Sequence, residues 1–240
     1  MPAYPIPAVL EKYRTLNESG MIKFLAGKST TFPDKENWPA GWKNDANLAI
    51  IPSKYSKRKV IGRVLSRLET MAENMNMFLW RPQLHSTILS GDLMTGDLKE
   101  ATYVGKRKEV FQKISEDVVM RALLDGFENI TASFRRLVFD GSTISLNCVS
   151  IPDKVRLLRM EAAVIYDRYG IPEKPMDNIF HVTVARIRTV PESTTLEDRA
   201  KFIAALSTLA VEVASNPVSV TFKNLWFGRN IQDVPEPPVY

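Results

Sequence analysis

The sequence of 240 residues has few of the side chains that most often bind metals or form disulfides, with one cysteine and two histidines. Cys148 has no second cysteine to pair with, so an internal disulfide is excluded, and its apolar neighbours predict a buried residue. No apolar run reaches the roughly 18 residues that a membrane-spanning helix needs. The first residues also lack the basic and then apolar layout of a signal peptide. We therefore expect a cytoplasmic protein with no membrane partner.

The bulk composition is otherwise ordinary. Hydrophobic residues make up 45% of the chain and charged residues 25%, which excludes a disordered chain and fits a globular protein with a sizeable core. The net charge of +5 and the isoelectric point near 9.2 favour an anionic partner. Cationic residues gather on one predicted helix, where a solvated helix face is the simplest interpretation: Lys54, Lys57, Arg58, Lys59, Arg63 and Arg67.

Three short patterns occur twice in the chain, in the same order. The first copy has AIIPSK at 49–54, QLHSTIL at 83–89 and FRRLVF at 134–139. The second has VSIPDK at 149–154, IFHVTVA at 179–185 and FKNLWF at 222–227. We predict a duplicated unit over residues 46–230. Residues 1–45, with their stretch TTFPDKENWPAGWKND, are predicted to form an irregular arm or lid, and residues 231–240 a loosely held tail.

The order of helices and strands repeats as well. Apolar residues at three- to four-residue spacing predict a helix over residues 57–77 and a counterpart after Pro152. Further helices are predicted over residues 108–127 and 196–213. The motif segments and residues 130–139, 143–149 and 218–227 are predicted strands, with a tight turn at Asp140-Gly141-Ser142. This order predicts an α+β fold with two related halves.

The two histidines stand at the same place in the repeat. His85 is followed by Thr87 at the second position, and His181 by Thr183 in the same way. On a strand such residues share a face, so each segment presents an imidazole beside a hydroxyl. A pseudo-twofold axis would bring both pairs to one small volume.

Such a pair suits phosphodiester cleavage. One imidazole can activate the attacking oxygen while the other protonates the leaving oxygen, because the pKa of imidazole lies near neutrality. The threonine hydroxyls can hydrogen-bond the non-bridging oxygens. Two alternatives are buried core histidines and a metal site. A metal site needs more ligands, yet Asp177 is the only acidic residue within five positions of either histidine.

These motifs resemble those of the 2H phosphoesterase superfamily, which takes its name from two H-x-[ST]-h motifs. FHVTVARI is the closer match, because members often carry H-[VIL]-T-[LVI]-x-R, and Arg186 matches that arginine. The resemblance implies a bilobal α+β fold whose two lobes, each an antiparallel sheet backed by helices, enclose the active-site cleft and can exchange strands. It also implies that His85 and His181 are acid and base, and that Thr87 and Thr183 bind phosphate. Arg186 is a weaker inference, since strand alternation puts it opposite His181 unless a bulge intervenes.

We therefore expect a metal-independent phosphodiesterase without a cofactor. Its substrate would be a cyclic nucleotide, an RNA-terminal 2′,3′-cyclic phosphate or a 2′-5′ phosphodiester. The alternatives are a non-catalytic nucleotide- or RNA-binding module with the same cleft, and a reversible 2′-5′ RNA ligase. Trp38 and Trp42 of the arm either stack on a base at the cleft or anchor the arm to the core. No oligomeric state is predicted.

Overall fold

The computed structural model describes residues 6–28, 45–93, 104–173 and 179–229. Its helices are α1 (Ile6–Leu25), the π-helical η2 (Ser56–Ile61), α3 (Gly62–Glu73), α4 (Val104–Glu116), α5 (Val118–Asp125), α6 (Asp153–Arg168) and α7 (Leu196–Ser215). Its strands are β1 (Asp45–Pro52), β2 (Phe78–Trp80), β3 (Ser86–Asp92), β4 (Ile130–Phe139), β5 (Thr143–Cys148), β6 (His181–Thr189) and β7 (Val218–Gly228). Trp38, Trp42 and the tail 231–240 lie outside the described residues.

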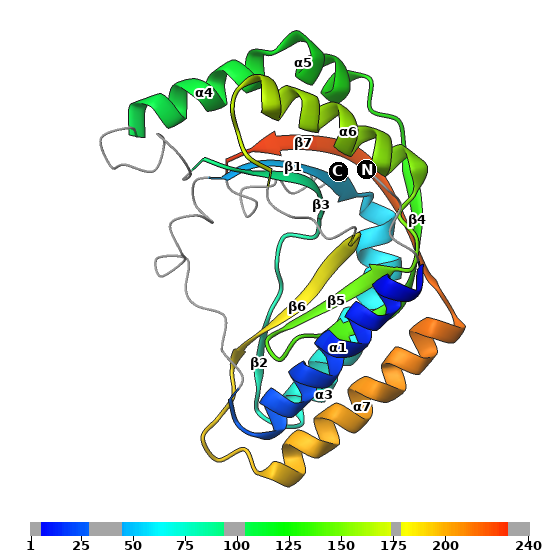
Figure 1. Ribbon diagram of the computed structural model, residues 1–240. Coiled ribbons are helices and arrows are strands. Elements are labelled where there is room, and N and C mark those ends of the chain that lie inside the picture. The colour runs from blue at the N-terminus through cyan, green and yellow to red at the C-terminus, as the bar shows by residue number, and fades with distance from the viewer. Residues whose placement is uncertain (1–5, 29–44, 94–103, 174–178, 230–240) are drawn as a thin grey trace.

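These strands form one antiparallel sheet in the order β2-β6-β5-β4-β7-β1-β3, which confirms the predicted α+β class. β4 and β7 pair through their N-terminal halves and then diverge, β4 beside β5 and β7 beside β1. We call β1, β3 and the end of β7 the first wing, and β5, β6, β2 and the end of β4 the second wing (Figure 1). The two expected lobes therefore share a continuous sheet.

A pseudo-twofold relation between the wings is visible in the strand register. In the β4–β7 pair, Ile130 lies opposite Phe222 and Phe134 lies opposite Val218. Exchanging the two strands therefore maps 130–134 onto 218–222. The segments FRRLVF and FKNLWF, picked out as a repeat in the sequence, occupy equivalent positions around this axis.

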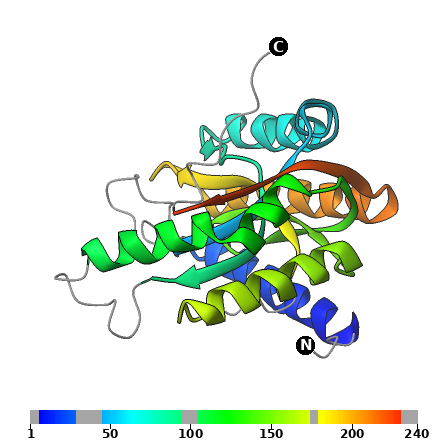
Figure 2. The same cartoon turned by 90° about the horizontal axis from the view of Figure 1, so that it is seen from above.

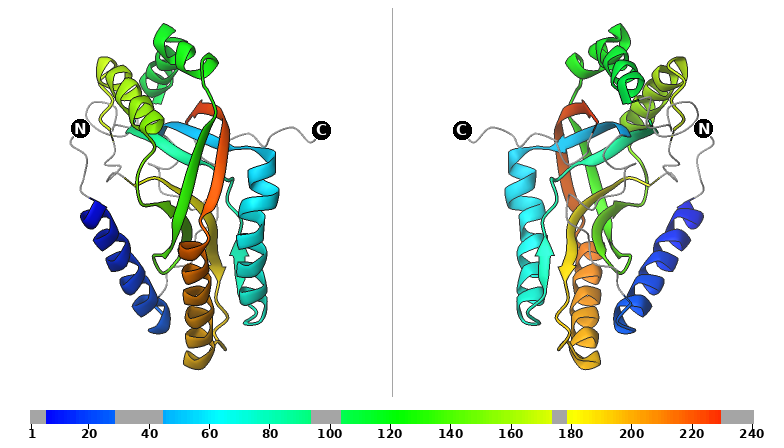
Figure 3. Two further views of the ribbon diagram at one scale, coloured as in Figure 1. Left: turned by 90° about the vertical axis from the view of Figure 1, so that its right-hand side faces the viewer. Right: turned by 90° about the vertical axis from the view of Figure 1, so that its left-hand side faces the viewer.

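The helices cover the outer face of the sheet in two groups. α1, α3 and α7 pack against the second wing, whereas α5 and α6 pack against the first wing, with α4 beside α5 (Figure 1, Figure 3). From above, α4, α5 and α6 lie together over the first wing (Figure 2). α3, which follows β1 of the first wing through η2, thus covers the second wing. In the same way α6, which follows β5 of the second wing, covers the first wing. This exchange ties the two halves into one unit.

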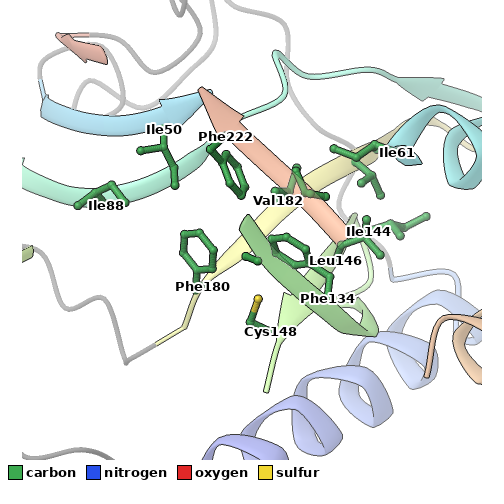
Figure 4. Close-up of a cluster of buried hydrophobic side chains, with 14 of the residues drawn as sticks. Ile50, Ile61, Ile88, Phe134, Ile144, Leu146, Cys148, Phe180, Val182 and Phe222 are labelled. Atoms are coloured by element: carbon green, nitrogen blue, oxygen red, sulfur yellow. The ribbon is translucent and has the colours of Figure 1, made fainter. Parts of the chain in front are cut away.

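One hydrophobic core runs through both wings. Phe134, Phe180 and Phe222 meet near the pseudo-twofold axis, with ring centroids 5.8 Å apart for Phe134–Phe180 and 5.7 Å for Phe180–Phe222 (Figure 4). Ile88 and Val182, from the two motif strands, are also fully buried in this core. The motif strands are therefore anchored by their inward-facing residues.

Part of the expected irregular arm is helical and packed. Residues 6–25 form α1, whose Tyr13 and Phe24 are buried. At Gly20 the helix touches the β4–β5 turn so closely that a Cβ atom would lie 2.2 Å from the Phe139 carbonyl oxygen. Asn17 accepts a hydrogen bond from the Phe139 amide through its Oδ1 atom at 2.9 Å. The Pro- and Gly-rich stretch at 30–45 dominated the prediction for the whole arm, and the helix was therefore missed.

Two further predictions change in detail. The single helix expected over 108–127 is broken at Asp117, whose carboxylate accepts hydrogen bonds from the Val119 and Met120 amides and so begins α5. In the first repeated pattern, Pro52 ends β1 but Pro152 caps α6. The I-P-x-K pattern therefore marks equivalent positions before the two helices, whereas the strands that precede these helices end at different distances from it. No helix in the described part of the chain is long and apolar enough to cross a membrane.

Candidate functional site

The two H-x-T motifs occupy equivalent positions in the two wings. His85 directly precedes β3, and His181 is the first residue of β6. The residue after each histidine pairs with an equivalent partner, Ile50 in β1 and Leu146 in β5. Although β6 and β3 are second and seventh in the sheet order, the two strands contact each other. The structure thus brings both histidines to the place where the wings meet.

A β-bulge follows each motif at the same position. The extra residue is Ile88 in β3 and Val184 in β6, directly after the motif threonine in each case. A bulge reverses the alternation of side chains beyond it, so Arg186 comes to the face that carries His181. Its positive charge acts on both imidazoles. The bulge that the sequence analysis required for Arg186 is therefore present.

The ring of His85 is held by the chain just before it. Its Nδ1 atom lies 2.6 Å from the carbonyl oxygen of Gln83. A carbonyl oxygen only accepts hydrogen bonds, so Nδ1 carries the proton and donates it. In the neutral ring the lone pair then lies on Nε2, the nitrogen that can accept a proton from a substrate.

Both imidazoles are partly buried and hard to protonate. The pKa of His85 is lowered to about 4, mainly by burial. The hydrogen bond to Gln83 opposes this shift, whereas the charges of Arg186 and Lys57, and that of His181 when it is protonated, contribute to it. Burial also lowers the pKa of His181 to about 4, with Arg186 and Arg159 adding to the effect. Both rings are neutral near pH 7. A phosphate anion between them would raise both pKa values, because its charge offsets those cations.

The motif threonines differ in exposure. Thr183 is 8% exposed and lies across from Ser145 of β5, whereas Thr87 is partly exposed and lies across from Ala49 of β1. Directly opposed residues in a sheet share a face, so Ser145 stands beside Thr183. Its hydroxyl accepts a hydrogen bond from Asn147 Nδ2 at 2.8 Å and keeps its own proton for another acceptor.

Arg159 of α6 links the two motif strands, and the sequence analysis missed it. Its Nε atom donates to the Ile88 carbonyl at 2.8 Å, and one terminal nitrogen donates to the Ile179 carbonyl at 2.7 Å. Ile88 is the bulge residue of β3, and Ile179 lies two positions before His181. One buried guanidinium thus fixes both motif strands. A signal was available, because Arg159 interrupts the apolar stripe of its helix between Val155 and Ala162.

The site contains groups suited to proton transfer and to holding an anion. Two imidazoles, two hydroxyls and one guanidinium face the region between the wings. Within the described ranges, no group of three or more His, Cys, Asp or Glu side chains is placed to hold a metal ion. Cys148 is buried, and burial raises the pKa of its thiol to about 12, so it remains protonated and behaves as a core residue.

The chain was compared with known proteins. No protein-family model matches it, and no curated protein sequence matches it. Among solved structures it is similar to a conserved protein of unknown function, ATU0111 from Agrobacterium tumefaciens, with 14% identity, a TM-score of 0.47 and coverage of 88% of this chain and 94% of that one. It is also similar to Kluyveromyces marxianus Usb1, with 13% identity, a TM-score of 0.46 and coverage of 80% and 97%. The MHV ns2 PDE domain has 16% identity, a TM-score of 0.36 and coverage of 60% and 84%.

Proposed function

We propose that this chain is a metal-independent phosphodiesterase in which His85 and His181 form the acid–base pair. The observation that carries the proposal is the position of the two imidazole–hydroxyl pairs at the same register on two contacting strands. Core histidines need no such symmetry, and the β-bulges that follow both motifs are a feature often found next to active sites. The motifs themselves resemble those of the 2H phosphoesterase superfamily.

In this mechanism the phosphodiester lies between the two imidazoles. One neutral ring accepts the proton of the attacking hydroxyl or water, and the other donates a proton to the leaving oxygen on the far side of the phosphorus. The donor needs a proton that a pKa of about 4 does not provide at neutral pH. The substrate's own negative charge supplies the missing stabilisation, so substrate binding creates the acid.

The remaining groups hold the non-bridging oxygens. Thr87 and Thr183 donate hydroxyl hydrogen bonds, and Arg186 provides a positive charge from the same face. These groups stabilise the negative charge on the non-bridging oxygens in the transition state. We assign the substrate to cyclic nucleotides, RNA-terminal 2′,3′-cyclic phosphates or 2′-5′ phosphodiesters. In a 2′,3′-cyclic phosphate water attacks the phosphorus and one ring oxygen leaves with a proton, whereas in a 2′-5′ phosphodiester the neighbouring 3′-hydroxyl can attack and the 5′ oxygen leaves, so each reaction needs one base and one acid.

The test is a turnover assay in excess EDTA. The wild-type chain is incubated with 2′,3′-cyclic nucleotides, 2′-5′ dinucleotides and RNA carrying a cyclic phosphate end, and the products are separated by chromatography. We expect hydrolysis of at least one substrate class. Loss of turnover on chelation with recovery on adding a divalent ion would overturn the metal-independent mechanism. Tight binding without product would favour a non-catalytic module, and joined ends in the presence of a 5′-hydroxyl RNA would favour ligation.

A further inference from the structure

The cationic helix divides its charges between two pockets. Lys54, Lys57 and Arg58 line a pocket of about 530 Å³ between the start of this helix and the chain leading to His85. Lys59, Arg63 and Arg67 line a different pocket, which they share with α7. In that second pocket Arg67 forms an ion pair with Glu212. The sequence suggested one solvated helix face, but the structure divides these charges between two separate pockets.

The first pocket, which we call the basic pocket, is strongly cationic. Arg81 adds a fourth positive side chain, and among the described residues that line it there is no Asp or Glu. Arg81 pairs with Glu69 on α3, which offsets part of its charge. Its apolar surface comes from Leu65, Pro82 and Leu84. The cations match the phosphates of a ligand, and the aliphatic side chains provide an apolar surface against which a base can lie.

The basic pocket adjoins the proposed catalytic site through two residues. Gln83 lines the pocket, and its carbonyl oxygen accepts the hydrogen bond from His85 Nδ1. Lys57 lines the pocket too, and its charge helps to lower the pKa of His85. A ligand in the pocket is therefore within electrostatic reach of the imidazole. The first turn is fixed by Ser56, whose hydroxyl accepts a hydrogen bond from the Thr221 amide at 3.0 Å.

We infer that the basic pocket binds a neighbouring nucleotide of a single-stranded nucleic acid whose scissile phosphodiester lies between His85 and His181. This inference rests on the proposed function, because that function defines which end of the strand enters the site. A pocket of about 530 Å³ exceeds the space that one phosphate needs and lies within the range of pockets that hold nucleotide-sized ligands. The preferred substrate is then an oligonucleotide end and not a free cyclic mononucleotide.

The test compares two double variants that remove the same charge from opposite sides of one helix. The first is Lys54→Gln/Arg58→Gln in the basic pocket, and the matched control is Lys59→Gln/Arg63→Gln in the other pocket. Both are made in the His181→Ala chain, so that cleavage of the probe is slow during the measurement. Binding of a labelled single-stranded octaribonucleotide is followed by fluorescence anisotropy across a salt titration.

We expect the first pair to weaken binding about tenfold at low salt and to reduce the slope of log Kd against log salt by about 1.4, at about 0.7 per phosphate contact. The control pair should leave the slope nearly unchanged. Equal losses in both variants, or no loss in either, would overturn the inference. Equally good displacement of the probe by poly-glutamate would also overturn it, because the pocket would then be a general polyanion surface.

Cleavage assays separate this inference from the proposed function. With both histidines present, Lys54→Gln/Arg58→Gln should raise KM for an oligonucleotide end about tenfold and leave kcat/KM for a 2′,3′-cyclic mononucleotide within about twofold. If the wild-type chain cleaves neither substrate but the anisotropy result holds, the proposed function fails and the binding pocket stands. If the mononucleotide is cleaved and both substrates respond alike to the variant, the pocket assignment fails instead.

Discussion

The two wings carry the same motif on the same backbone but surround it with different side chains. In the second wing, Ser145 and Asn147 lie opposite Thr183 and His181, and Arg186 follows the bulge. In the first wing Ala49 lies opposite Thr87, and Ser90 stands where the second wing has Arg186. The backbone register, including the bulges, has kept the duplication while polarity and charge have diverged. We conclude that register positions the imidazoles, whereas the unequal surroundings make their environments distinct.

Replacing either histidine should have the largest effect on activity. His85→Ala or His181→Ala is expected to lower kcat by about 10²–10⁴, because each removes one of two proton transfers. The kcat of the double variant should be only slightly lower than that of the less active single variant. The reason is that the effects of groups acting as a unit do not add. Circular dichroism and thermal unfolding provide the control for folding. Near wild-type turnover in either single variant would remove that residue from the pair.

Sequence reasoning predicted the fold class, most of the strands and the motif equivalence, because these depend on local periodicity and on a repeat. β4 matches its predicted range, and β5 ends one residue earlier than predicted. Sequence could not predict that the helices cross to the opposite wing, or that Ile88 and Val184 bulge, because both follow from long-range packing. Arg159 was missed for the same reason, since its partners are carbonyls 71 and 20 residues away.

The link made by Arg159 should have the largest effect on stability. Arg159→Met keeps much of the buried volume but removes both donors, at a cost of about 1–3 kcal/mol for each carbonyl left without a partner. The matched control is Arg156→Met on the same helix, where an exposed pair with Asp153 at 3.7 Å should contribute little. Urea unfolding measures the difference. Equal unfolding free energies for the two variants would show that the link does not stabilise the wings.

Proton NMR can measure the pKa of each imidazole separately, because the chain has only two histidines. The effect of each neighbouring cation can then be assigned from single variants. Arg186→Ser should raise the pKa of both rings, since Arg186 lowers both. Lys57→Met should raise the pKa of His85 alone, and Arg159→Met that of His181 alone. An Arg186→Ser variant in which His85 titrates as in the wild type would show that the charge of Arg186 does not act on both rings.

Arg186→Ser also copies the first wing's Ser90 into the second wing, and should lower kcat/KM about 10- to 100-fold through loss of a charged phosphate contact. The acid limb of the kcat/KM profile should move to higher pH along with the pKa values.

The same pKa values predict how stability depends on pH. Because both rings titrate near pH 4 in the folded chain and near 6.5 in the unfolded chain, the unfolded chain binds more protons between these pH values, and stability falls as pH drops through this window. In Arg186→Ser the free energy of unfolding should fall less steeply as pH drops, because the folded-state pKa values lie closer to 6.5.

The smallest effect is expected at the threonines, where the wings should differ. Thr87→Val and Thr183→Val keep the branched shape and remove one hydroxyl, so each should cost about threefold to tenfold in kcat/KM and leave the pH profile in place. Thr183→Val should cost less, because the neighbouring Ser145 hydroxyl accepts from Asn147 and can donate its own proton to the phosphate. Thr87 has only Ala49 opposite it. Adding Ser145→Ala to Thr183→Val should therefore bring the loss up to that of Thr87→Val, whereas an unchanged loss would mean that Ser145 does not reach the phosphate.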